Sequence, residues 1–269
     1  FLHNLPFYGL AVLCGDDQNI MKLRKEVKRA IVTYGIKSQA DYQATNIRQD
    51  GMRMFFNVSL KDTNELEIDL KLPGSHNVLN ALGAIAVADR VGIHPNAIRN
   101  GLRKFSGVSR RFEVLGEIPV GSGHVIVVDD YAHHPRELEA TISAAEGCWP
   151  GRRKVIIFQP HRFSRTENLM NDFSALLCSS ECLLITEVYA AGEKPIPEAD
   201  SQALCQSIKA RGECTPLFVS SLNDLHETLM PLMREGDIIL TLGAGDIGHW
   251  VRDFIKNSAP SASIKDSLI

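Results

Sequence analysis

The beginning of the chain alternates short apolar runs with turn residues. Residues 11–14 (AVLC) form an apolar run that ends in a Gly-Asp-Asp turn. Residues 52–60 (MRMFFNVSL) and 65–72 (ELEIDLKL) flank the polar residues 61–64, which predicts a β-hairpin. In the second of these runs every other side chain is apolar, as in a strand with one buried face.

The spacing of apolar residues then becomes helical. In residues 77–91 they recur three and four positions apart, and the pattern stops before Gly92, a residue type that ends helices. Residues 95–105 predict a second, shorter helix, because they begin with a proline in the first turn. The pattern changes again at residues 106–109, where we expect a hinge.

From residue 110 onward, strand-like and helix-like segments alternate. The predicted strands are residues 125–128, 155–158, 182–186, 217–219 and 237–242, and the predicted helices are residues 136–146, 166–178, 201–211, 222–234 and 247–255. Repeated strand–helix units force parallel pairing through right-handed crossovers. The fold class is therefore α/β, with a Rossmann-like, doubly wound and mostly parallel sheet of about five or six strands.

These patterns divide the chain into three segments. Residues 1–107 hold the hairpin and two helices, and residues 108–256 hold the strand–helix units. Residues 257–269 are rich in Ser and contain a Pro and a Lys, and we expect a disordered tail there.

Composition and charge narrow the class of partner. The chain has 269 residues, of which 44% are hydrophobic and 23% are charged, as in ordinary globular proteins. Its net charge of −3 argues against nucleic acid and membrane surfaces as partners. We find no membrane-length apolar run, no signal peptide, no C-x-x-C pair and no zinc spacing, so we expect a cytoplasmic protein without a zinc site.

Polar side chains follow two of the predicted strands. The run DDYAHHP comes directly after residues 125–128, and the run QPHRFSRT comes directly after residues 155–158. Ligands of open parallel sheets bind at the carboxyl ends of strands. We therefore expect the two runs to converge on one cleft.

Each run suggests a chemistry. Asp129 and Asp130 suit a cation or the hydroxyls of a ribose, and the alternative is a helix cap. Arg162 and Arg165 open a predicted helix, where guanidinium groups and free backbone N–H groups bind a carboxylate or phosphate. The alternative there is surface salt bridging. A zinc site on the two adjacent histidines is disfavoured, because neighbouring side chains point apart and no third ligand is spaced to help.

Two further motifs concern nucleotides. Asn77 and Asn80 lie three residues apart, hence on one helix face, and their amides suit an adenine edge, although Ser75 or Asn77 could simply cap the helix. Residues 243–248 (GAGDIG) match a dinucleotide fingerprint but lack the second strand and acidic residue that should follow it. We interpret them as a tight turn, and a nicotinamide-dependent oxidoreductase remains the alternative. The sequence has no G-x-x-x-x-G-K-[ST] phosphate loop.

Taken together, the motifs resemble the Mur ligase family. The blocks FLHNLPFYG, LPGSHNVLNALGAIAVA, GVSRRFEVLGE, VDDYAHHPRE, FQPHRFSRT, EVYAAGEKPIP and TLGAGDIG occur in the family's order, from Phe1 to about Ile255. The resemblance implies the last part of a central ATPase domain followed by a Rossmann-like C-terminal domain. It places the phosphate loop and the main Mg²⁺ ligands upstream of Phe1, so we expect this chain alone to be inactive.

The resemblance also implies a reaction. ATP and Mg²⁺ would activate the lactyl carboxylate of UDP-N-acetylmuramate as an acyl phosphate, and L-alanine would attack it in peptidoglycan precursor synthesis. A family member that recycles a murein tripeptide is an alternative, and a homodimer is left open.

The residues that match the family's motifs receive roles by resemblance only. Those expected to contact ATP are His76, Asn77, Asn80, Arg111 and Asp130, and those expected to hold the amino acid and the lactyl end are Tyr131, His133, Arg162 and Arg165. Arg111, Asp130 and His133 would be catalytic, and no metal ligand is assigned within this chain.

Overall fold

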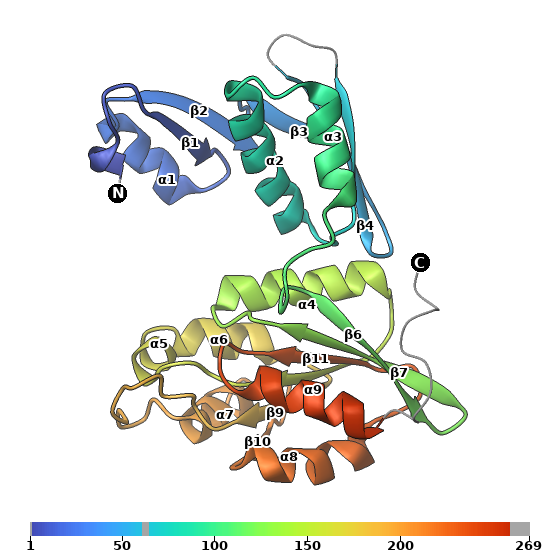
Figure 1. The fold of residues 1–269 in the computed structure, drawn as a ribbon. Coiled ribbons are helices and arrows are strands. Elements are labelled where there is room, and N and C mark those ends of the chain that lie inside the picture. The colour runs from blue at the N-terminus through green and yellow to red at the C-terminus, as the bar shows by residue number, and fades with distance from the viewer. Residues whose placement is uncertain (1, 61–64, 259–269) are drawn as a thin grey trace. The chain divides into compact units, whose positions relative to one another are not determined.

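The computed structural model describes residues 2–60 and 65–258. Two compact units make up the chain, Phe1–Gly107 and Val108–Ile269 (Figure 1). No helix among the described residues is both long enough and apolar enough to cross a membrane.

The first unit is built on a five-stranded sheet. Its strands, in spatial order, are β1 (Leu10–Cys14), β2 (Ala30–Gly35), β3 (Tyr42–Asp50), β4 (Arg53–Val58) and β5 (Leu66–Leu70). The first three are parallel, whereas β4 pairs antiparallel with both β3 and β5. The two predicted hairpin strands are thus confirmed, and their connection, residues 61–64, lies outside the described residues.

The helices of this unit are α1 (Gln18–Leu23), α2 (Ser75–Arg90) and α3 (Pro95–Lys104), with single 3-10 turns η1 (Leu2–Asn4) and η2 (Arg24–Glu26). The apolar stripe that predicted α2 is its buried face, because Val78, Leu82 and Ile85 are fully buried against the sheet. The helix begins two residues earlier than expected, directly after Gly74.

The second unit is a six-stranded sheet with the order β10-β9-β8-β11-β7-β6. Its strands are β6 (Glu113–Val120), β7 (Gly123–Asp130), β8 (Lys154–Phe158), β9 (Cys182–Thr186), β10 (Leu217–Val219) and β11 (Ile238–Leu242). All neighbours are parallel except β6, an antiparallel edge strand. This confirms the predicted fold class.

The edge strand β6 was not predicted. It lacks the continuous apolar run of a central strand, and its pairing with β7 is interrupted by a bulge between Val114 and Gly116. Pro119 is tolerated because this strand lies at the edge of the sheet.

Helices cover both faces of the second sheet. They are α4 (Pro135–Cys148), α5 (Phe163–Asn168), α6 (Met170–Leu177), α7 (Ser201–Lys209), α8 (Leu222–Leu229), the 3-10 turn η3 (Met230–Leu232) and α9 (Ile247–Ser258). Helices α4, α6 and α7 pack together on one face, and α8 and α9 pack on the other (Figure 1). This is the doubly wound arrangement that the alternating pattern predicted.

Three predicted helix boundaries were wrong. The single helix expected over residues 166–178 is two helices, because the backbone of Leu169 leaves the helical region between α5 and α6. The helix expected over residues 222–234 ends at Leu229, where a 3-10 turn containing Pro231 follows. Helix α9 runs on to Ser258, so the expected tail begins later, and residues 259–269 lie outside the described residues.

Candidate functional site

A row of four rings crosses the carboxyl ends of β7, β8 and β9. The ring centroids of Tyr131 and His133 lie 5.3 Å apart, those of His133 and His161 lie 5.6 Å apart, and those of His161 and Tyr189 lie 5.5 Å apart. The first two residues come from the loop after β7, and the other two from the loops after β8 and β9. The polar runs after β7 and β8 therefore converge, as the sequence predicted.

The loops after β8 and β9 are held together by their backbones. His161 and Tyr189 form a parallel bridge beyond the ends of their strands. The amide of Tyr189 donates to the carbonyl of Pro160 over 2.8 Å, and the amide of Arg162 donates to the carbonyl of Tyr189 over 2.9 Å. The stacked imidazole and phenol rings thus rest on a continuation of the sheet, which fixes their geometry.

Arg165 is attached to this row. Its Nη1 donates to the carbonyl of His161 over 3.0 Å and lies 3.1 Å from Nδ1 of the same residue. Burial first, and then the positive charges of Arg165 and Arg162 among its neighbours, lower the pKa of His161 below its ordinary value. His161 is therefore a neutral imidazole at neutral pH.

Arg162 has a different environment. It is the N-cap of α5 with a positive φ of 71°, and its side chain is 50% exposed. Its Nη1 lies 3.8 Å from Glu193, whose carboxylate also accepts hydrogen bonds from the amide and hydroxyl of Ser164. These hydrogen bonds from Ser164 lower the pKa of Glu193.

This geometry corrects one part of the predicted anion site. Two backbone amides at the start of α5 are not free, because those of Arg162 and Ser164 already donate to Tyr189 and Glu193. An anion at this position would be bound by the two guanidinium groups, and Glu193 would compete with it for Arg162.

Neither aspartate caps α4. The N-cap is His134, which forms a capping box with Glu137. Asp129 is fully buried and pairs with Arg110 and Arg252 over 3.2 Å and 3.1 Å. Burial raises the pKa of Asp129 in spite of these two cations. Its carboxylate is therefore part of an internal ion-pair network.

Asp130 connects two loops. Its carboxylate oxygens accept hydrogen bonds from the amides of Phe112 and Ala132, both over 2.8 Å. Burial raises the pKa of Asp130, although these hydrogen bonds oppose the shift.

The neighbouring Arg111 is exposed, and its guanidinium makes no hydrogen bond or ion pair with the described residues. It is available to a ligand.

In the first unit, the asparagine pair lies on the first turns of α2. The amide nitrogen of Asn77 donates to the carbonyl of Pro73 over 2.8 Å, and that of Asn80 donates to Oδ1 of Asn77 over 3.3 Å. Gly74 is the N-cap and no side chain caps the helix, so the capping alternative was wrong. His76 is half-buried beside them.

The GAGDIG segment forms the turn between β11 and α9. A Cβ atom at Gly245 would overlap the side-chain amide of Gln159 and the ring of Tyr189. Gln159 in turn donates to Asp246 over 2.6 Å and accepts from the amide of Ile247 over 3.1 Å. The protein's own side chains therefore fill the space that the glycines leave, which disfavours the nicotinamide alternative.

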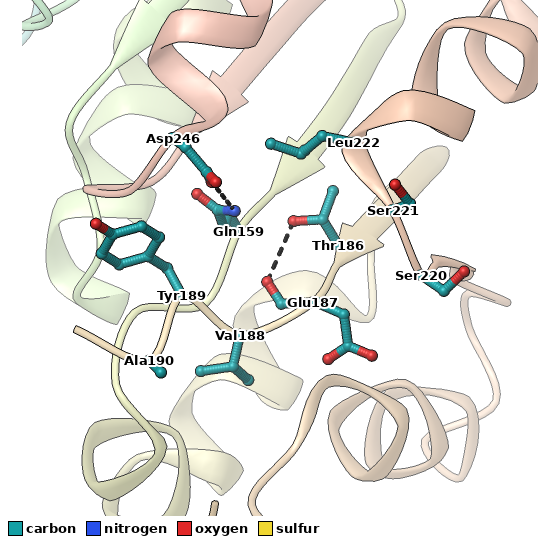
Figure 2. A pocket seen from close by; sticks show the side chains of 10 residues that line it. All are labelled: Gln159, Thr186, Glu187, Val188, Tyr189, Ala190, Ser220, Ser221, Leu222 and Asp246. Atoms are coloured by element: carbon teal, nitrogen blue, oxygen red, sulfur yellow. Dashed lines mark hydrogen bonds between the residues drawn. The ribbon is translucent and has the colours of Figure 1, made fainter. Parts of the chain in front are cut away.

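A cavity of about 380 Å³ opens beside this turn. Figure 2 shows its lining, which is Gln159, Thr186, Glu187, Val188, Tyr189, Ala190, Ser220, Ser221, Leu222 and Asp246. These residues follow β8, β9, β10 and β11, so the cavity lies at the carboxyl edge of the sheet, where ligands of such folds bind.

Sequence reasoning missed several residues of the site. Gln159 directly follows the strand predicted over residues 155–158, and Tyr189 stands three residues after the strand predicted over residues 182–186. That position near a strand end was the signal that could have identified them. Arg110 and Glu193 carry no comparable local signal, because only the folded chain brings them to the strand ends.

Among the described residues no group of three or more His, Cys, Asp or Glu side chains could hold a metal ion.

Two models of known protein families match this chain. The family model described as "Mur ligase, glutamate ligase domain" matches residues 110–245, about half of the chain. The chain belongs to the Mur ligase family. The model described as "Mur ligase middle domain" matches residues 1–88, so the chain holds parts of two consecutive family domains.

Solved structures of Mur ligases share the fold. UDP-N-acetylmuramate-alanine ligase MurC from Thermotoga maritima is similar at 29% sequence identity and a TM-score of 0.73, over 92% of this chain and 51% of that one. MurF from Acinetobacter baumannii has a TM-score of 0.73 at 16% identity, over 95% and 53% of the two chains. The murein peptide ligase mpl from Psychrobacter arcticus has a TM-score of 0.66 at 23% identity, over 96% and 53%. This Mur ligase chain spans about half the length of the proteins it matches.

Proposed function

We propose that this chain is part of an ATP-dependent amide-forming ligase that joins L-alanine to the lactyl carboxylate of UDP-N-acetylmuramate. The similarity to the alanine ligase of Thermotoga maritima, at 29% identity, supports alanine as the amine donor. The similarity to MurF and to the murein peptide ligase is lower, at 16% and 23%, and supports only the fold.

The observation that carries the proposal is the placement of Arg162 and Arg165 beside the row of rings. A free amino acid offers a carboxylate, and guanidinium groups are suited to bind one in bidentate fashion. Neutral His161, stacked on Tyr189, adds a polar but uncharged wall. Such a site binds the carboxylate of the donor and leaves its amine free to react.

The reaction itself needs mainly positioning. ATP transfers a phosphoryl group to the lactyl carboxylate, the donor amine attacks the resulting acyl phosphate, a C–N bond forms, and inorganic phosphate leaves. Holding the amine next to the acyl carbon lowers the entropic part of the barrier. In this proposal Tyr131, His133 and the two arginines orient the donor, and Arg111 and Asp130 serve the nucleotide.

The first unit would contribute to ATP binding. The side chain of Asn80 is exposed, and its amide can both donate to and accept from an adenine edge. Asn77 and His76 flank it on the same turn of α2. The described residues offer no Mg²⁺ cluster, so we assign no step to the metal within this chain.

A donor-competition assay tests the proposal. The product of the entire reading frame is incubated with ATP, UDP-N-acetylmuramate and one donor at a time: L-alanine, D-alanyl-D-alanine or a murein tripeptide. We expect ADP release and a product mass that corresponds to one added alanine. Product with the tripeptide alone would assign the recycling ligase instead, and an absence of product with every donor would refute the proposal. The 269-residue chain serves as control, and we expect no turnover from it because it lacks a phosphate loop.

A further inference from the structure

Arg110 connects three parts of the second unit. Its Nη2 donates to the carbonyl of Gly243 over 2.6 Å, its Nη1 to the carbonyl of Gly245 over 3.3 Å, and its Nε to Asp129 over 3.2 Å. The guanidinium thus ties the turn after β11 to the end of β7.

The same residue holds Tyr131 at two points. The backbone carbonyl of Arg110 accepts a hydrogen bond from the amide of Tyr131 over 2.7 Å. Its guanidinium carbon lies 5.0 Å from the centroid of the Tyr131 ring, which is cation–π distance. That ring stands perpendicular to the ring of His133, and the residue remains 42% exposed. One surface of the ring is therefore fixed while another faces solvent.

Gly248 makes this position of the guanidinium possible. A Cβ atom built on Gly248 would overlap Cζ, Nε and Nη2 of Arg110. The neighbour is the charged head group, which is held by three acceptors, so it cannot move aside without losing them. Because Gly248, the last glycine of the GAGDIG segment, has no side chain, it leaves room for the guanidinium of Arg110.

We infer that Arg110 is a positioning residue for Tyr131. We also infer that residue 248 must be a glycine for the guanidinium of Arg110 to occupy its place. The functional half of this inference rests on the proposed function, in which Tyr131 contacts the amine donor. Arg110 would act only through Tyr131, by keeping its ring in one orientation before the donor arrives. A donor site that is already ordered avoids an entropic cost on binding.

Arg252 supplies a matched control. It also pairs with Asp129, over 3.1 Å, and with Glu113, over 2.7 Å, but among the described residues its guanidinium makes no hydrogen bond or cation–π contact with Tyr131 or the glycine turn. Removal of either arginine leaves Asp129 with one cation instead of two, so both variants should lose stability. Only the loss of Arg110 should allow the ring of Tyr131 to change its orientation.

The structural half is tested by NMR on the 269-residue chain with ¹³C-labelled tyrosine, with the Tyr131 signal assigned from Tyr131→Phe. We expect Arg110→Gln to move the Tyr131 ring resonances, and Arg252→Gln to leave them in place. Gly248→Ala should move them in the same direction as Arg110→Gln. Unmoved Tyr131 signals in a folded Arg110→Gln variant would overturn the inference, whether or not the protein is a ligase.

The functional half is tested by kinetics in the complete ligase. We expect Arg110→Gln to raise the KM for the amine donor about tenfold, with kcat changed less than about threefold, which is the effect of a lost cation–π contact on a positioned ring. Arg110→Lys should recover part of the loss, because it keeps the charge but not the planar fork. Adding Gly248→Ala to Arg110→Ala should cost nothing further, because the overlapping group is gone. A moved ring with an unchanged donor KM would overturn the functional half and the donor role of Tyr131 together, while ligase turnover itself would still stand.

Discussion

Nδ1 of His161 lies 3.1 Å from Nη1 of Arg165. A guanidinium can only donate hydrogen bonds, so the imidazole nitrogen that faces it must accept. The proton of neutral His161 is therefore on Nε2. Burial and the nearby guanidinium together favour the neutral form of this ring, and the contact with Arg165 determines its tautomer.

The charge of Arg165 should be visible in the titration of His161. The pKa of His161 is lowered by burial and by the guanidinium of Arg165, and removal of a neighbouring positive charge favours the imidazolium form. We expect Arg165→Ala to raise the pKa of His161, measured by NMR from the Cε1–H signal over pH. Arg211→Ala is the control, since Arg211 is bound to Ser174 in the same unit. An unchanged titration curve in Arg165→Ala would contradict the electrostatic coupling.

The two arginines should also govern the use of the amine donor. We expect Arg162→Ala and Arg165→Ala, each made in the complete ligase, to lower kcat/KM for the donor by about 10- to 1000-fold, the effect of a lost charge-assisted contact. Steady-state rates of ADP release at varied donor concentration measure this. Arg211→Ala should stay near the parent rate. Parent-like donor kinetics in both variants would remove them from the donor site.

The sequence was sufficient to predict the central part of the second sheet. Its buried parallel strands are continuous apolar runs, so a segment such as residues 125–128 is predicted as a buried strand. In the first unit, β2 (Ala30–Gly35) and β3 (Tyr42–Asp50) were missed. Tyr42–Asp50 carries polar side chains at most positions, and its pairing rather than its pattern makes it a strand.

The candidate site was predictable only in part. Strand ends are where such folds bind ligands, and this rule singled out the two polar runs that contain Tyr131, His133, Arg162 and Arg165. The role expected of each residue came from the family resemblance. The rule cannot say what each side chain binds within the protein. The pairing of Arg110 with a turn that is 133 residues away depends on the folded sheet, and no local pattern encodes it.

Breaking the buried ion pair between Arg153 and Asp237 should destabilise the second unit. Asp237 is 2% exposed, accepts from Nε of Arg153 over 2.9 Å and also accepts from the amide of Arg234 over 2.7 Å. We expect Asp237→Ala to cost about 3–5 kcal/mol, because it leaves a cation without its partner in a buried site. Urea unfolding followed by circular dichroism measures the loss.

The control for that variant is an exposed pair. Arg48 and Asp50 lie 3.2 Å apart, and their side chains are 60% and 71% exposed. We expect Asp50→Ala to change the free energy of unfolding by at most about 1 kcal/mol. Equal losses in Asp237→Ala and Asp50→Ala would show that burial of the pair has no effect on its contribution.

Asp16 should make the first unit sensitive to acid. Its carboxylate accepts hydrogen bonds from the amides of Ile36 and Ser38, both over 2.8 Å, and from that of Lys37 over 3.1 Å. Burial opposes ionisation, but these hydrogen bonds outweigh it and lower the pKa of Asp16. The carboxylate thereby joins the turn after β1 to the end of β2.

The lowered pKa determines the direction of the pH dependence. A carboxyl group whose pKa is lower in the folded state contributes stability above its unfolded pKa of about 3.9, and this contribution disappears as pH falls through the folded pKa. We expect Asp16→Asn to cost about 1 kcal/mol at pH 7, a modest value because the group is partly solvated. The difference from the parent chain should shrink below about pH 4, because Asp16 becomes protonated in the unfolded chain at a higher pH than in the folded one. Urea unfolding at pH 7, 5 and 3 measures it, with Asp50→Asn as the exposed control. A loss that is as large at pH 3 as at pH 7 would mean that the amide hydrogen bonds do not depend on the charge.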